Sequence, residues 1–324
     1  MKIFVPIAVA AAVALGAATV DAPAEPTRVL ADCERTSTGL VPLTDMGRRR
    51  YRGYRGGLYP NGRNRPSPAY LRQGLAAARQ VKPVDGKIVL LSIGMSNTTQ
   101  EFSDFKARAD RDPAKSEDVE LVDGAEAGWD AQRIRSARSP YWELVDQRLN
   151  EAGAVPEQVQ AIWLKQVISG EGRPFPQDAR TLQASLRAIV RILRARFVNL
   201  HLVFLSSRTY AGYAITARSP EPQAYDSAFA ARWLINERMQ RTPKKASGPW
   251  VGWGPYLWTD GMKGRRDGLT WSCDDVEYDG THPSNSGAQK VSTLLLDFFK
   301  SDPTAKPWFR ERGGPAVKPV LAPR

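Results

Sequence analysis

Two short segments near opposite ends of the chain carry side chains that can cooperate in nucleophilic chemistry. Gly94-Met95-Ser96-Asn97 places a serine directly after an apolar run, and Asp279-Gly280-Thr281-His282-Pro283 places an aspartate three residues before a histidine. A serine hydroxyl becomes an effective nucleophile when an imidazole accepts its proton and a carboxylate orients that imidazole. We therefore examine Ser96, His282 and Asp279 as a possible hydrolytic centre.

Imidazole is scarce in this chain, which has only two histidines. His201 alternates within an apolar run, which predicts a structural role, whereas His282 lies in a Gly/Pro loop before the apolar segment 291–299. His282 is therefore the candidate base. The simpler alternatives are that Ser96 only caps a helix and that His282 lies in a solvated capping loop.

The elements that would position these residues follow an alternating pattern. Continuous apolar runs of strand length occur at 87–93, 119–122, 159–164, 200–205 and 250–253, and helical periodicity occurs at 177–196, 224–240 and 285–300. Short apolar runs between helices are typical of parallel strands buried on both faces. The sequence predicts an α/β fold with a doubly wound parallel sheet of about five strands.

In such sheets ligands bind beyond the carboxyl ends of the strands. The polar and aromatic residues that follow the predicted strands are therefore candidate substrate contacts. They are Asn97, Lys165, Arg208, Tyr210, Trp253 and Tyr256. Aromatic faces beside hydrogen-bonding groups suit sugar rings, although simple packing of the loops explains the aromatic residues equally well.

The order and spacing of these segments resemble those of the SGNH/GDSL hydrolases over residues 86–300. That family has its serine after the first strand and an Asp-x-x-His block near its C-terminus. Gly94-Met95-Ser96-Asn97 is most similar to the Gly-Gln-Ser-Asn variant of carbohydrate O-acetylesterases, and the segment 161–166 is similar to a distorted form of their Trp-His-Gln-Gly-Glu block. The resemblance implies a flavodoxin-like three-layer sandwich.

By this resemblance Ser96 is the nucleophile, His282 the general base and Asp279 its orienter. The resemblance also implies an oxyanion site made by the N–H of Ser96, a glycine N–H and a side-chain amide. We assign the glycine to Gly128, with Gly124 as the alternative, and the amide to Gln166, with Lys165 as the alternative. The sequence departs from the family at Met95, where an aspartate is usual, and in the third block.

The N-terminal residues have the features of an export signal. Lys2 precedes an apolar stretch that ends in small residues suited to cleavage, which predicts a signal peptide over residues 1–24 and a secreted or periplasmic protein without a remaining transmembrane segment. The remaining domains are predicted as an Arg/Gly/Pro-rich extension at 25–85, a catalytic domain at 86–301 and a tail at 302–324. In an oxidising compartment, Cys33 and Cys273 are expected to form a disulfide.

The formal net charge of the 324-residue chain is +12, with arginines concentrated between positions 48 and 65. No nucleic-acid-binding motif accompanies them, so we predict either a solvated loop or contact with an acidic glycan or surface. No metal or cofactor is expected, since the acidic cluster at 274–279 lacks the spacing of a calcium loop.

These observations predict a serine esterase that hydrolyses a carboxylic ester, with an acyl group on a carbohydrate as the expected substrate. The alternative is a non-catalytic glycan-binding or envelope-interaction protein on the same fold, which the altered first and third blocks favour.

Overall fold

A computed structural model of the protein describes residues 1, 31–170, 172–217, 220–240 and 248–311. The predicted signal peptide, apart from its first residue, and the end of the predicted tail lie outside these ranges. No helix in the part of the chain that is described is long and apolar enough to cross a bilayer.

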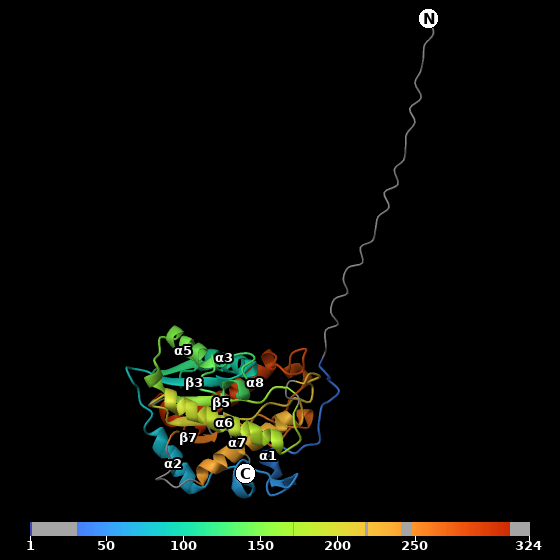
Figure 1. Cartoon of the computed structure of the whole chain (residues 1–324), viewed down its shortest axis with the longest axis horizontal. Coiled ribbons are helices and arrows are strands. Elements are labelled where there is room, and N and C mark those ends of the chain that lie inside the picture. Colours follow the sequence, from blue (N-terminus) through green and yellow to red (C-terminus); the bar gives the residue numbers. More distant parts are fainter. Residues whose placement is uncertain (2–30, 171, 218–219, 241–247, 312–324) are drawn as a thin grey trace.

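Within the described ranges, five strands form a parallel sheet in the order β4-β3-β5-β6-β7 (Figure 1). Their bounds are Ile88–Gly94 for β3, Val119–Asp123 for β4, Val159–Lys165 for β5, Leu202–Ser206 for β6 and Trp250–Trp253 for β7. The first strand of this sheet along the chain, β3, lies inside it. The next strand, β4, is added on one side of β3, and β5, β6 and β7 are added on the other. This order confirms the predicted doubly wound α/β fold and makes the end of β3 its topological switch point.

Helices cover both faces of the sheet. On one face α3 (Ser96–Ala109) packs against α8 (Asn285–Ser301), and on the other α6 (Gln177–Arg196) packs against α7 (Gln223–Met239). The shorter elements are α1 (Leu43–Met46), β1 (Arg50–Tyr51), β2 (Tyr54–Arg55), α2 (Pro68–Ala78), α4 (Ala131–Ile134), α5 (Tyr141–Glu151) and α9 (Lys306–Phe309).

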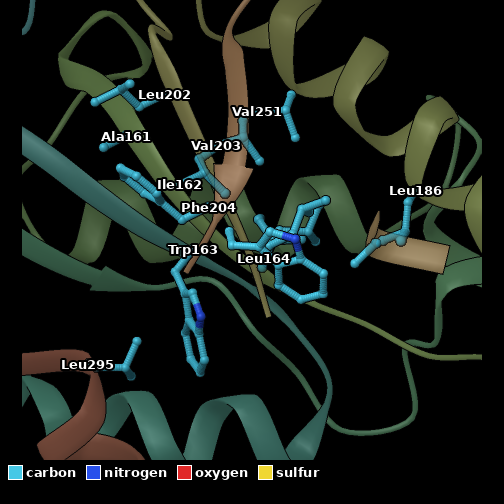
Figure 2. Packing of buried hydrophobic residues seen from close by; sticks show 14 of the residues in the cluster. Ala161, Ile162, Trp163, Leu164, Leu186, Leu202, Val203, Phe204, Val251 and Leu295 are labelled. Atoms are coloured by element: carbon cyan, nitrogen blue, oxygen red, sulfur yellow. The ribbon is translucent and has the colours of Figure 1, made fainter. Parts of the chain in front are cut away.

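The alternation of side chains along β5 shows how the sheet is buried on both sides. Trp163 points toward the face on which Leu295 of α8 lies (Figure 2), and its ring stacks on Phe102 of α3. Its neighbour Leu164 points to the opposite face, because successive side chains of a strand alternate. Every residue of β5 is buried, which explains why this segment of the sequence is mostly apolar.

The N-terminal extension docks on the α/β region through hydrogen bonds and aromatic packing. The buried carboxylate of Asp260 accepts hydrogen bonds from Ser37, Thr38 and Gly39. In the hairpin formed by β1 and β2, Tyr51 contacts rings of α7 while the arginines remain exposed. The hairpin is therefore anchored to α7 by its tyrosines, and its arginine side chains face solvent.

A disulfide between Cys33 and Cys273 joins the extension to the short 3-10 helix Cys273–Asp275. The two cysteines are 240 residues apart in sequence and their Cα atoms lie 5.3 Å apart. This bond confirms the predicted pairing, and such bonds are characteristic of proteins outside the reducing cytosol.

Removing this disulfide is expected to destabilise the fold without changing its core. The Cys33→Ser, Cys273→Ser double variant should lose on the order of 4 kcal/mol of unfolding free energy, because a long loop is then free in the unfolded chain. Denaturant unfolding of the oxidised protein, the reduced protein and the variant measures this loss. Equal stability of all three would show that hydrogen bonds and aromatic packing hold the extension without the disulfide.

Candidate active site

Ser96 lies at the first turn of α3, directly beyond the carboxyl end of β3. Gly94 allows the backbone to pass close to Thr98 and Lys165 at this turn. A Cβ at this position would overlap the Thr98 side chain and the backbone oxygen of Lys165. Met95, not Ser96, is the N-cap residue. The serine is thus held at the positive end of the helix, with its hydroxyl free for another partner.

The loop that carries His282 is ordered by the side chain of Asp279. The Oδ1 atom of Asp279 accepts hydrogen bonds from the N–H groups of Thr281 and His282, both at 2.9 Å. Gly280 has φ = 65° and packs against the backbone of Tyr213, so a side chain at this position is excluded.

Asn97 joins this loop to α3, since its buried Nδ2 donates to the carbonyl of Thr281 at 2.7 Å. Asn97, predicted as a substrate contact, therefore also fixes Ser96 relative to His282.

The three predicted side chains form a continuous line of hydrogen bonds. Ser96 Oγ lies 2.8 Å from His282 Nε2, and His282 Nδ1 lies 2.6 Å from Asp279 Oδ2. Partial burial would raise the pKa of Asp279, but its hydrogen bonds to the His282 ring and to backbone N–H groups outweigh burial and hold that pKa well below its usual value. The carboxylate is thus ionised where it can orient the imidazole.

A cavity of about 400 Å³ opens beside Ser96 and His282. Its volume is within the usual range for a small-molecule site. Besides these two side chains it is lined by Met95, Asn97, Gly128, Asp130, Arg133, Val167, Ser169, Gly170, Arg208 and Thr281. The lining comes from segments that follow β3, β4, β5 and β6 and from the His282 loop, as expected at a switch point.

The structure distinguishes the two glycines considered for the oxyanion site. Gly128 lines the cavity with φ = 78°, and neither its N–H nor that of Ser96 makes a hydrogen bond within the described part of the chain. Gly124 does not line the cavity, and its N–H donates to Ser92 Oγ at 3.2 Å. Of the two glycines, Gly128 is thus the one that lines the cavity and has an N–H without a partner in the described part of the chain.

Neither of the two side chains considered as third donor lines the cavity. The Nε2 atom of Gln166 donates to the carbonyl of Trp129 at 2.8 Å, and Lys165 is buried against both carboxylate oxygens of Glu101. Burial lowers the pKa of Lys165 to about 8 despite the nearby Glu101. Gln166 thus holds the segment that follows Gly128, and Lys165 is part of an internal ion pair.

The predicted aromatic contacts lie in the core, where the extension covers them. Tyr210 donates to the carbonyl of residue 35, Trp253 donates to that of residue 58, and Tyr256 accepts from the N–H of residue 43. All three are at most 5% exposed and none lines the cavity. In the structure these three side chains, predicted as substrate contacts, make packing contacts with the extension and lie outside the cavity lining.

Sequence reasoning found Arg208 but missed other residues of the cavity wall. Arg133 comes from α4, and Asp130 caps this helix by accepting from the N–H groups of Gln132 and Arg133. Asp130 also accepts from the N–H of Ser169, which joins the segment after β5 to α4 in the cavity lining. No apolar pattern marks α4, although an aspartate at its N-cap position is a recognisable local feature.

Comparisons with known proteins find no matching family model and no matching curated protein. Among solved structures, the chain is similar to the lipopolysaccharide acetyltransferase periplasmic domain of Salmonella ser. Paratyphi A, with a TM-score of 0.36, 11% identity and coverage of 72% of this chain and 88% of the other. It is also similar to a protein from Arabidopsis thaliana, with a TM-score of 0.34, 13% identity and coverage of 62% and 67%. Likeness at this level carries no information about activity.

Proposed function

We propose that the protein is a serine esterase that hydrolyses a carboxylic ester, with an acyl group on a carbohydrate as its substrate. The observation that supports this most is the line of hydrogen bonds from Ser96 Oγ through His282 to Asp279. Ser96 and His282 also line a cavity that can hold a substrate. A serine that only capped a helix would have no need of an imidazole at 2.8 Å.

In this mechanism Ser96 Oγ attacks the acyl carbonyl while His282 Nε2 accepts the hydroxyl proton. His282 then returns the proton to the leaving alcohol, and a water molecule activated by the same ring releases the acid from Ser96. Asp279 holds the ring in the tautomer that leaves Nε2 free to accept.

The charge that develops on the carbonyl oxygen is stabilised by the N–H groups of Ser96 and Gly128. Both are unpaired in the described part of the chain, and the first lies at the positive end of α3. Such donors lower the barrier most when they are already in place before the reaction. The loop from Gly128 to Trp129 is held by Gln166, so this residue supports the oxyanion site indirectly.

We further propose that the enzyme works outside the cytosol, in the periplasm or after secretion. The disulfide between Cys33 and Cys273 supports an oxidising compartment. The proposed division of the chain gives residues 86–301 the catalytic role and gives the extension at 25–85 a docking role on that domain. The exposed arginines between positions 48 and 65 are available for contact with acidic glycans.

Labelling with a fluorophosphonate tests the proposed nucleophile directly. This reagent reacts with a serine whose proton an adjacent base removes, so mass mapping should place one adduct on Ser96. Ser103→Ala is the matched control, because Ser103 lies exposed on the same helix and should not affect labelling. Absence of an adduct on the folded protein would instead support the non-catalytic glycan-binding alternative.

A further inference from the structure

Positive charge converges on the cavity from two elements distant in sequence. Among the described residues that line it, Arg133 of α4 and Arg208, which follows β6, carry guanidinium groups. Arg133 is exposed at the rim, where it donates to the carbonyl of Gly128 at 3.0 Å. Arg208 is 4% exposed and lies in the wall. The proposed hydrolysis assigns no role to either group.

The guanidinium of Arg208 is buried without the partners that such a group needs. Its Nε and Nη2 atoms have no hydrogen bond within the described part of the chain. Burial lowers its pKa, although the charges of Glu101, Glu221 and Asp279 oppose this. None of these carboxylates bonds to it: Glu101 is taken by Lys165, and Glu221 accepts from Ala211, Tyr225 and Trp258.

Asp130, the carboxylate among the described lining residues, does not supply the missing partner either. Its oxygens accept three backbone N–H groups, those of Gln132, Arg133 and Ser169. Buried charged donors left without acceptors are costly, and arginine remains protonated in proteins. The cavity wall therefore contains the charge of Arg208 without a protein acceptor for it in the described part of the chain, and its Nε and Nη2 atoms are themselves closed to solvent.

We propose that the substrate of this cavity carries an acidic group, a carboxylate or a phosphate, which Arg208 binds in the wall and which Arg133 attracts at the rim. This rests on the proposed function: the acidic group belongs to the carbohydrate whose ester reaches Ser96. Carboxylate and phosphate are the acceptors with which a guanidinium group makes its strongest hydrogen bonds. A neutral sugar of the same shape leaves Arg208 unpaired.

Binding to the Ser96→Ala protein measures this selectivity without turnover. Calorimetry should compare glucuronate with glucuronamide and glucose 6-phosphate with glucose. At least one acidic member should bind roughly 10- to 100-fold more tightly than its neutral counterpart, as expected for hydrogen bonds between charged groups. The pair that shows the difference identifies the acidic group as carboxylate or phosphate. Equal affinities in both pairs would overturn the proposal.

Arginine variants in the Ser96→Ala background assign the selectivity to the two side chains. Arg208→Gln should abolish it, and Arg208→Lys should restore only part, because lysine keeps the charge but lacks the guanidinium group. Arg133→Gln, at an exposed position that should not affect folding, should reduce it. Arg72→Gln is the control, since Arg72 is exposed on α2, away from the cavity. Selectivity that survives all cavity variants would contradict the assignment.

Hydrolysis of p-nitrophenyl acetate separates this role from direct participation in the reaction. If Arg208 were instead an oxyanion donor, Arg208→Gln would lower kcat for this neutral ester about 100-fold or more, and acidic sugars would show no preference in binding. That combination would overturn the proposal. An inactive wild-type protein that still prefers acidic sugars would contradict the esterase activity and leave the acidic site supported.

Discussion

His282→Ala is expected to abolish hydrolysis of p-nitrophenyl acetate, with a fall in kcat of about 10⁴- to 10⁶-fold, as for the corresponding residues of other serine hydrolases. The reason is geometric: His282 Nε2, at 2.8 Å from Ser96 Oγ, is the atom placed to accept the hydroxyl proton. Steady-state kinetics of purified, folded variant measure the effect. The value of KM should change little, because the imidazole acts mainly in the transition state.

The other histidine provides the matched control for this experiment. His201 lies at the start of β6, at the opposite end of the strands from Ser96, where its backbone N–H donates to Gln160. Its partial burial lowers its pKa. His201→Ala should lower stability while leaving kcat close to that of the wild type. Retained turnover in His282→Ala, or an equal loss in both variants, would contradict the proposed base.

The fold and the candidate catalytic line were predictable because their patterns are local. Each strand is a mostly apolar run, and α6 has the bounds that its periodicity predicted, 177–196. The chain also offers few bases, so His282 was found by elimination and Asp279 by its spacing. Ser96 followed from its place after β3.

The cavity wall was less predictable, because it depends on contacts between distant segments. The side chains of Tyr210, Trp253 and Tyr256 follow strands as sugar-binding residues do, yet segments some 200 residues earlier in the chain cover them. Gln166 and Lys165 are adjacent, but each points to a different internal partner, Trp129 or Glu101. Sequence spacing alone does not show which partner a polar side chain finds.

Asp279→Asn is expected to lower kcat about 10⁴-fold while leaving the site assembled. The Asn side chain can keep the Oδ1 acceptor for the N–H groups of Thr281 and His282, so the loop should stay in place. Its amide, however, presents N–H instead of a carboxylate oxygen toward His282 Nδ1, which favours the wrong tautomer. Structure determination or amide hydrogen exchange of the variant checks the loop, and kinetics with p-nitrophenyl acetate check the rate.

The pH dependence of stability gives a second, independent measurement on the same variant. The pKa of Asp279 is lowered in the folded protein, so its carboxylate binds protons more readily when the chain is unfolded. Its contribution to stability is then fully present above the unfolded pKa of about 3.9 and is lost as the pH falls toward the folded pKa. The difference in unfolding free energy between wild type and Asp279→Asn should therefore shrink as the pH falls below about 4. A difference that does not change with pH would mean that Asp279 is not held ionised by His282 and the loop, and a kcat near that of the wild type would remove Asp279 from the mechanism.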